Sequence, residues 1–239
     1  MTFTEIIQSY LDEKRKHKIC ELEMRFGRNP PKPMTAKRLT RIDYNNVIQR
    51  LLSLGFICKD MSGEDLLRIS IQGYRNIRVE LKGLDTIQRY CKTNQLTSSY
   101  SFMMKEPIDR LELPEYRVST SLSEERPLDE KGPEVKAILS DWEKSRKSFR
   151  YINRVRLYKE GVPIYIDCSI VKMSSQTDFR TNYTSTIQES NVFDNAEAYE
   201  IEMEVESNGT VKEIESQIKT TMKHILGGLQ QTLFPVSYV

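Results

Sequence analysis

The chain has 239 residues, which is enough for one large domain with a substantial hydrophobic core. Hydrophobic residues make up 38% and charged residues 29%, and the net charge of +2 excludes a chain that holds nucleic acid by uniform positive charge. The most apolar stretch, 47–58, contains an arginine and is too short to span a bilayer, and the first residues lack the apolar region of a signal peptide, so we expect no membrane association.

Apolar periodicity and turn residues predict helices and strands that alternate along the chain. The first half is expected to contain a helix over 4–16, a strand over 21–27, a break at the prolines of 29–33, a helix from the N-cap Asp43 to just before Gly55, strands over 66–73 and 76–83, and a short helix over 84–93. The second half is expected to contain an irregular stretch up to 115, strands over 116–125, 148–161 and 162–174, a polar loop near 174–182, a strand over 198–207, and a last helix that Thr210 and Glu213 open as a capping box.

The connections between these strands indicate the fold class. The pairs 66–73 with 76–83 and 148–161 with 162–174 are expected to form hairpins. Because strands outnumber helices and the evident connections are hairpins, we expect a mainly β (α+β) protein with an antiparallel sheet or barrel and flanking helices. No linker divides the sequence, so we expect a single domain over 1–239.

The spacing of the cysteines and histidines indicates neither a metal cluster nor a catalytic histidine. The four cysteines are widely spaced with no Cys-x-x-Cys pair, which argues against a zinc cluster and fits reduced thiols in an intracellular protein. Neither His17 nor His224 has a second ligand at metal-binding spacing. Histidine-based catalysis is therefore not expected.

Two strands near opposite ends of the sequence carry carboxylates at every second position. Since residues i and i+2 of a strand share a face, Glu21, Glu23 and Arg25 point one way. The other strand groups four glutamates in the same manner: Glu200, Glu202, Glu204 and Glu206. A row of like charges is repulsive unless a cation offsets it, and magnesium or manganese prefers such oxygen ligands. One such strand is typical of a solvated face; two of them leave a metal site and a solvated face as open alternatives.

Other strands carry positive charge in the same alternating style. Arg154 and Arg156 share a face, Arg78 and Lys82 share a face with Glu80 between them, and Arg68 lies on the strand before them. Two further faces mix charge with hydroxyls: Arg117, Ser119, Ser121, Ser123 and Glu125 on one strand, and Tyr165, Asp167 and Ser169 on another. In a barrel, these faces can line the interior as basic walls for phosphate.

The motifs resemble those of a known enzyme family. "ELEMRFG" at 21–27 and "YEIEMEVE" at 199–206 resemble the two glutamate motifs of the triphosphate tunnel metalloenzymes, in the branch of fungal and large-DNA-virus RNA 5′-triphosphatases. "INRVRLYKEGVPIYIDCSIVK" at 152–172 resembles the family's basic strand and the Arg-x-Asp-x-Thr strand that follows it, and "YRVSTSLSEE" resembles its strand that ends on a glutamate. "LQQTLFPVS" at 229–237 resembles the junction before a guanylyltransferase domain, as in a giant-virus, mimivirus-type capping enzyme.

The resemblance implies an eight-stranded antiparallel β-barrel tunnel and a role for each matching residue. Metal ligands are expected at Glu21, Glu23 and Glu204, and a catalytic acidic floor at Glu200 and Glu202. A carboxylate that helps to activate water is expected at Glu125, with Glu124 as the alternative. The remaining catalytic residues implied are Arg154, Arg156 and Asp167. Phosphate-binding residues are expected at Arg25, Arg68, Arg78, Lys82, Arg117, Arg154, Arg156 and Ser169.

Three positions depart from the family pattern. Arg154 stands where the family usually has lysine, and a guanidinium fork binds phosphate differently from an ammonium. Tyr165 replaces the arginine before the aspartate, so that phosphate contact is lost or supplied elsewhere. Ser169 replaces threonine and keeps the hydroxyl.

The implied function is removal of the γ-phosphate from triphosphate-ended RNA, the first step of mRNA capping, with Mg²⁺ or Mn²⁺ as cofactor. Nascent mRNA and nucleoside triphosphates are the expected substrates, a fused guanylyltransferase domain the expected partner, and a virion or a cytoplasmic site of viral transcription the expected location. Two alternatives remain: a polyphosphatase or thiamine-triphosphatase of the same fold, and a non-catalytic RNA-binding barrel.

Overall fold

The computed structural model describes residues 2–16, 19–27, 39–58, 60–97, 99–174, 176–177, 180–207 and 209–229. The predicted break at 29–33, His17 and the closing stretch after Leu229 lie outside these residues. The helices are α1 (Phe3–Arg15), α2 (Arg41–Ser53), α3 (Leu84–Thr93), α4 (Pro133–Ser140) and α5 (Val211–Leu229), with a short 3₁₀ turn η1 (Pro114–Tyr116). The strands are β1 (Cys20–Phe26), β2 (Ile57–Cys58), β3 (Glu64–Ile71), β4 (Ile77–Lys82), β5 (Tyr100–Leu113), β6 (Val118–Pro127), β7 (Lys147–Lys159), β8 (Val162–Met173), β9 (Gln176–Thr177), β10 (Arg180–Thr181) and β11 (Ala198–Val205).

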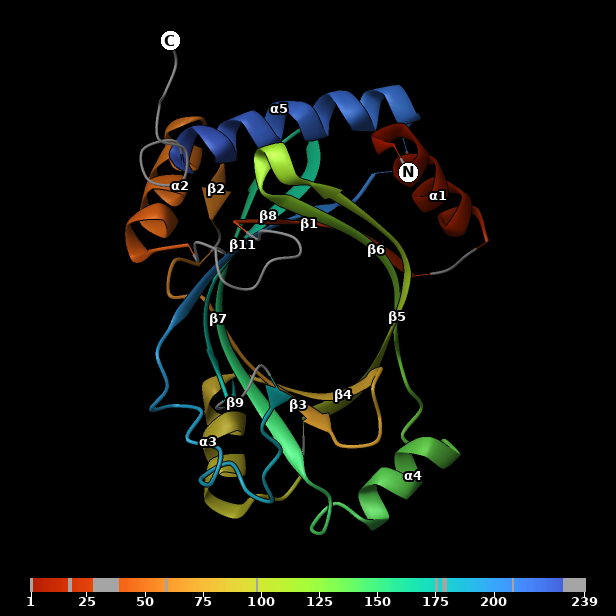
Figure 1. The fold of residues 1–239 in the computed structure, drawn as a ribbon, viewed down its shortest axis with the longest axis vertical. Helices are drawn as coiled ribbons and strands as arrows, with labels where there is room; N and C mark the ends of the chain where they lie inside the picture. The colour runs from red at the N-terminus through yellow and green to blue at the C-terminus, as the bar shows by residue number, and fades with distance from the viewer. Residues whose placement is uncertain are drawn as a thin grey trace.

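Eight of these strands form a closed antiparallel barrel. They follow one another around it in the order β7, β3, β4, β5, β6, β1, β11 and β8, and β8 pairs back onto β7 (Figure 1). The short β2 adds to the outside end of β7, and β9 pairs with β10 separately. The expected eight-stranded tunnel and both expected hairpins are confirmed.

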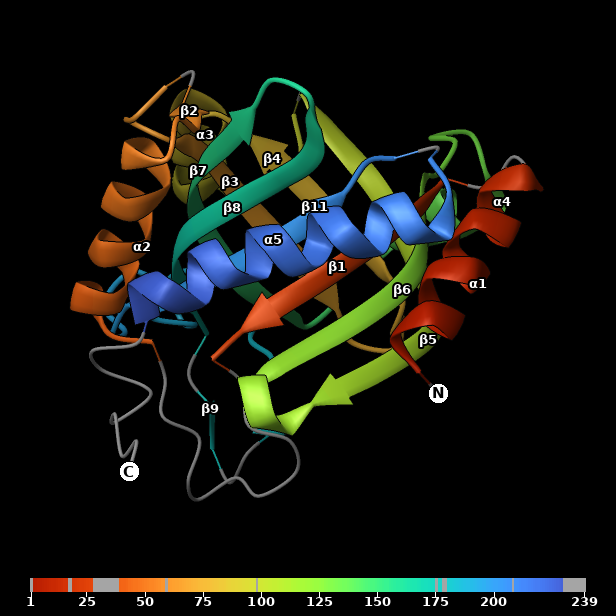
Figure 2. The same cartoon turned by 90° about the horizontal axis from the view of Figure 1, so that it is seen from above.

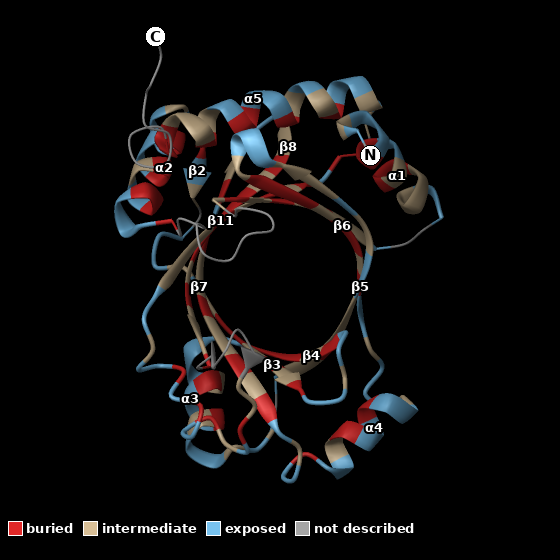
Figure 3. Ribbon diagram, in the orientation of Figure 1, coloured by how far each residue is buried: buried red, intermediate tan, exposed pale blue. Residues whose placement is uncertain are grey.

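Helices cover two opposite walls of the barrel. Helices α1, α2 and α5 lie over the wall of β1, β11 and β8, whereas α3 and α4 lie at the wall of β3 and β4 (Figure 1). In Figure 3 the buried residues of each helix lie on the side that faces the barrel. None of the helices in the described parts of the chain is long and apolar enough to cross a membrane.

Two hydrophobic cores lie between the strands and these helices. In the first, Leu22 and Met24 of β1 are fully buried among residues of α1 and α5 such as Ile7 and Ile218. The second joins residues of β3 and β4 to those of α3 and α4 at the opposite wall. Burial of a large apolar side chain contributes about 1.5–3 kcal/mol, so these cores dictate that the more apolar face of the strands points outward. The charged faces are left for the interior, where Leu66, Ile152 and Val171 also form a small apolar cluster.

Helix α5 packs closely on α2 at a glycine. A Cβ at Gly228 would lie 2.9 Å from the Cα of Val47, so no larger residue fits there without movement of the backbone. At the other end of α5, Thr210 and Glu213 exchange side-chain and backbone hydrogen bonds, which confirms the expected capping box.

Two features of the sequence interpretation are wrong. Asp43 is not the N-cap of α2: Thr40 is, and Asp43 stands at the third helical position of the capping box. The stretch expected to be irregular contains the 14-residue strand β5. Its alternation is broken by Pro107, where the pairing with β6 shifts register, and this bulge conceals the strand in the sequence.

Candidate active site

The polar side chains of the barrel line two adjoining cavities of about 260 Å³ each. We call the first the acidic chamber; it is lined by Glu21, Glu23, Glu64, Leu66, Arg68, Glu80, Lys82, Ser101, Met103, Lys105, Glu125, Arg154, Arg156, Asp167, Glu202 and Glu204. We call the second the basic chamber; it is lined by Glu23, Arg25, Arg68, Arg78, Lys105, Arg110, Ser119 and Ser121. Glu23, Arg68 and Lys105 belong to both linings, so the chambers meet at these residues.

The carboxylates of β1 and β11 lie close together because these two strands are paired neighbours in the barrel. Glu23 is directly opposite Glu204 in the register of β1 and β11, and Glu21 follows on the same face of β1. Side chains opposite each other across antiparallel strands have Cβ atoms about 4.5–5.5 Å apart. Two carboxylates therefore face one another in the tunnel, with a third beside them.

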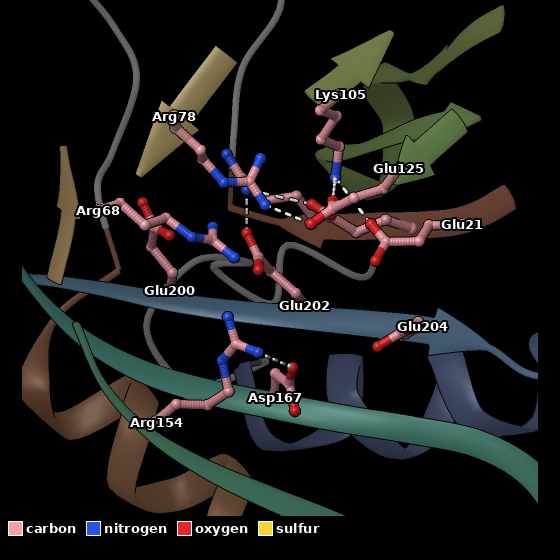
Figure 4. A network of polar contacts seen from close by, with 12 residues as sticks. Glu21, Arg68, Arg78, Lys105, Glu125, Arg154, Asp167, Glu200, Glu202 and Glu204 are labelled. Atoms are coloured by element: carbon pink, nitrogen blue, oxygen red, sulfur yellow. Dashed lines mark hydrogen bonds and ion pairs between the residues drawn. The ribbon is translucent and has the colours of Figure 1, made fainter. Parts of the chain in front are cut away.

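Lys105 of β5 reaches into this group from the next strand but one, since β6 lies between β5 and β1. Its Nζ lies 2.9 Å from Oε2 of Glu21, 3.4 Å from Oε2 of Glu23 and 3.3 Å from Oε2 of Glu125 (Figure 4). One ammonium thus holds three carboxylates from two strands.

The carboxylates of this group differ in how well their charge is offset. Burial raises the pKa of Glu21 to about 7, although Lys105 acts in the opposite direction. Burial also raises the pKa of Glu204, with Arg156 opposing the rise. At Glu23 burial acts in the same sense, but its cationic neighbours outweigh it and hold the pKa below its ordinary value. The charged forms of Glu21 and Glu204 are therefore stabilised less by the protein than by water, and a bound cation would favour them.

This donor set fits a hard divalent cation. Within the residues that the structure describes, no three Asp, Glu, His or Cys side chains are already gathered as metal ligands, since Lys105 holds Glu21 and Glu23 while Arg156 donates to Glu204 over 2.8 Å. However, the acidic chamber contains eight carboxylates against five cationic side chains. Oxygen donors with excess negative charge suit magnesium or manganese. Glu21, Glu23 and Glu204 would hold such an ion with Lys105 in another rotamer.

A cluster of arginines lies beside the carboxylates. The buried Glu80 accepts hydrogen bonds from Nε of Arg68 at 2.9 Å and from Nε of Arg78 at 2.8 Å, and Arg78 also pairs with Glu125. Burial lowers the pKa of Arg68, and the nearby Arg78 and Arg154 lower it further. The positive charge here is therefore only partly neutralised, which favours the binding of an anion.

Strands β7 and β8 contribute a second basic group. Arg156 donates two hydrogen bonds of 2.7 Å to Asp167, and Nη1 of Arg154 lies 3.3 Å from the same carboxylate. The guanidinium of Arg156 also lies 5.0 Å from the ring centroid of Tyr165, within cation–π range. Tyr165, where the sequence resemblance led us to expect an arginine, thus supports an arginine of the neighbouring strand.

The remaining glutamates of β11 are paired with arginine. Arg25 bridges Glu23 and Glu202, and Arg150 of β7 pairs with Glu200. Burial raises the pKa of Glu202, and the adjacent Glu23 raises it further.

Comparison with known proteins gives a match in structure. No family model and no curated protein matches the sequence. The crystal structure of the RNA triphosphatase domain of a trifunctional mimivirus mRNA capping enzyme aligns with a TM-score of 0.63 at 16% identity, over 93% of this chain and 96% of that chain. The chain has the fold of that triphosphatase domain. A triclinic structure of the mimivirus capping enzyme triphosphatase gives the same values, and a monoclinic one gives a TM-score of 0.62 at 16% identity over the same shares. The resemblance inferred from the sequence is confirmed at the level of the fold.

The tunnel fold brings most of the residues expected from the sequence to one lumen. Those that line the chambers are Glu21, Glu23, Arg25, Arg68, Arg78, Lys82, Glu125, Arg154, Arg156, Asp167, Glu202 and Glu204. Glu125, and not Glu124, is among the lining residues. Ser169 is buried on β8, opposite both Arg154 and Glu200 in register.

Arg117 lies elsewhere. It follows η1 in the connection between β5 and β6, with a left-handed φ of 52°, and lines neither chamber. Strand parity placed it with Ser119, but β6 begins only at Val118, so Arg117 belongs to the turn and does not follow the alternation of the strand. Its expected role as a phosphate ligand stays a prediction.

The sequence interpretation missed several lumen residues. Lys105 and Arg110 lie on β5, whose alternation Pro107 interrupts. Glu64 stands at the start of β3, two residues before the expected strand. Arg150 of β7 had a usable signal, because it has the same parity as Arg154 and Arg156.

Proposed function

We propose that this chain is a metal-dependent RNA 5′-triphosphatase that removes the γ-phosphate of triphosphate-ended RNA by in-line attack of water. The observation that carries the proposal is the tunnel lumen, where carboxylates of β1 and β11 with incompletely offset charge adjoin arginines of β3, β4 and β7. This is the charge pattern needed for a metal ion and a polyphosphate side by side. The mimivirus domain of the same fold is described as an RNA triphosphatase.

In this proposal, one group of residues would bind the metal ion and another the phosphate. Glu21, Glu23 and Glu204 would hold Mg²⁺ or Mn²⁺, which when bound offsets the charge that develops on the γ-phosphate. Arg154 and Arg156, fixed by Asp167, would bind the phosphate oxygens.

Glu125 would orient the attacking water. The pKa of Glu125 is lowered: burial alone would raise it, but Arg78 and Lys105 outweigh burial. The carboxylate is therefore ionised at neutral pH and accepts a hydrogen bond from water. No covalent nucleophile is required.

The remaining expectations belong to the same proposal. The chain would form the N-terminal domain of a longer viral capping enzyme, followed by a guanylyltransferase, and would act where viral mRNA is made. The trifunctional nature of the mimivirus enzyme supports this arrangement.

Release of labelled γ-phosphate from triphosphate RNA, with and without Mg²⁺ or Mn²⁺, tests the proposal. Glu23→Ala should nearly abolish release, while Glu130→Ala, at an exposed turn residue before α4, should leave it unchanged. Wild-type activity in Glu23→Ala would contradict the site. Activity confined to tripolyphosphate or thiamine triphosphate would indicate the polyphosphatase alternative, and salt-sensitive RNA binding without phosphate release would indicate a non-catalytic barrel.

A further inference from the structure

Within the described residues, the tunnel has two openings of different character. The connection η1 between β5 and β6 lies at one end of the barrel and the β7–β8 turn at the other (Figure 2). We call them the η1 opening, with Arg110, Tyr116 and Ser119, and the β7–β8 opening, with Glu64 and Arg156. The basic chamber lies toward the first and the acidic chamber toward the second.

The two chambers carry opposite charge. Among the side chains that line it, the basic chamber contains five cations, Arg25, Arg68, Arg78, Lys105 and Arg110, and one carboxylate, Glu23. Three of these cations, Arg25, Arg78 and Arg110, also pair with glutamates outside this lining, and the cations remain in excess there. The acidic chamber has more carboxylates than cations, and Glu64 stands exposed at its outer end. A polyanion that approaches the η1 opening is attracted, whereas one that approaches the β7–β8 opening first meets carboxylates.

The strand register gives the distance along the tunnel from Arg110 in the basic chamber to Glu204 in the acidic chamber. Arg110, Ser121, Glu23 and Glu204 lie opposite one another in one row across β5, β6, β1 and β11. Because barrel strands tilt by about 35–45° and lie about 4.8 Å apart, each step along the row advances roughly 3 Å along the tunnel. Arg110 and Glu204 are therefore separated by roughly 9 Å along the axis, which is comparable to the span of a triphosphate.

An aromatic side chain stands at the η1 opening. Tyr116 ends η1 and is 46% exposed, next to the start of β6 where Ser119 lies. The side chain of Arg110 is 62% exposed at the same end, and its Nε forms an ion pair with Oε1 of Glu112. Tyr116 does not line the basic chamber itself but is exposed in the connection at that end of the barrel, where it can stack on a single-stranded base whose phosphates the cations hold.

We propose that the RNA enters by the η1 opening, with the basic chamber holding the α- and β-phosphates and Tyr116 stacking on the first base. The γ-phosphate then lies at Glu21, Glu23 and Glu204. This inference rests on the proposed function and adds the direction in which the RNA enters the tunnel. It also gives the site a means to prefer RNA, because tripolyphosphate fills the chambers but has no base for Tyr116.

Photocrosslinking tests the direction without turnover. The probe is a short RNA with a 5′-β,γ-imidotriphosphate and 4-thiouridine at its second nucleotide, irradiated with the full chain and mapped by mass spectrometry. We expect crosslinks in 110–119. Crosslinks near 159–161 and Glu64, or equal labelling of both openings, would overturn the proposal.

Kinetics provide a second test. Tyr116→Ala should raise KM for triphosphate RNA by about fivefold to tenfold, with KM for tripolyphosphate unchanged. Arg110→Glu should raise KM for RNA about tenfold and flatten its salt dependence, whereas the half-exposed Arg126→Glu, which lines neither chamber, should not. An equal rise for both substrates in Tyr116→Ala would overturn the stacking role. If the wild type releases phosphate from neither substrate, the proposed function fails, while the crosslinks still decide the direction.

Discussion

Glu21→Gln should make the metal-free protein more stable at pH 8 and leave its stability nearly unchanged at pH 5. The pKa of this carboxyl is about 7 in the folded protein because of its burial, and about 4.3 in an unfolded chain. Between these values the unfolded chain has already lost the proton that the folded protein keeps. The stability of the wild type therefore falls as the pH rises from about 4.3 to 7, and the whole loss is present above 7.

The magnitude follows from the same two values. A difference of about 2.7 pKa units at 1.36 kcal/mol per unit gives an upper limit of about 3.7 kcal/mol. Since the side chain of Glu21 is 28% exposed, solvent screening reduces this to about 1–2 kcal/mol. Glutamine cannot ionise, so the variant avoids this loss.

Glu23→Gln is the matched control, two residues along the same strand. Its carboxylate pairs with Arg25 and Lys105, and its pKa is held low despite burial, so the charged form stabilises the fold. Removal of one partner from a buried pair should destabilise the protein at pH 8 by about 3 kcal/mol.

Urea unfolding in the presence of EDTA at pH 5 and pH 8 measures both effects. The expected result is opposite signs for the two variants at pH 8. A Glu21→Gln protein that is less stable than the wild type at pH 8, or equally shifted at both pH values, would refute the reasoning. Addition of Mn²⁺ at pH 8 should then stabilise the wild type more than Glu21→Gln, because the variant lacks one ligand.

Three further substitutions have defined outcomes. Lys105→Met should tighten Mn²⁺ binding in the absence of phosphate, since the ammonium no longer competes for the carboxylates; weaker binding in calorimetry would contradict this. Tyr165→Leu should lower phosphate release about twofold to fivefold by freeing Arg156, whereas Tyr165→Phe keeps the ring and should not; equal losses would exclude a cation–π role. Gly228→Ala should lower the free energy of unfolding by about 1–3 kcal/mol, because its Cβ would lie 2.9 Å from Val47; an unchanged Tm would show that α2 and α5 separate easily.

Strand parity was sufficient to sort the side chains of the glutamate motifs. In β1, Leu22 and Met24 are buried on one face while Glu21 and Glu23 share the other, as the alternation predicts. The hairpins and the cap at Thr210 were likewise predictable, because a turn or a cap depends on residues close together in the sequence. The Thr40 cap was missed because Asp43 is equally suited to that position by residue type.

The interior of the site depended on contacts between distant segments. Lys105 is 84 residues from Glu21 in the sequence, and Arg78 is 47 from Glu125. Nothing local in these strands specifies which neighbour each will have, and Pro107 conceals β5 altogether. Lys105 could therefore be found only in the folded chain.

The sequence by itself determined that several strands have one charged face and one apolar face, since a period of two follows from backbone geometry alone. Only the tertiary structure decided that the charged faces point inward. The helices bury the apolar faces on the outside of the barrel, and the closure of β8 onto β7 encloses the charges. Confined in a small cavity and removed from water, the same carboxylates and arginines acquire shifted pKa values that an exposed strand would not give them.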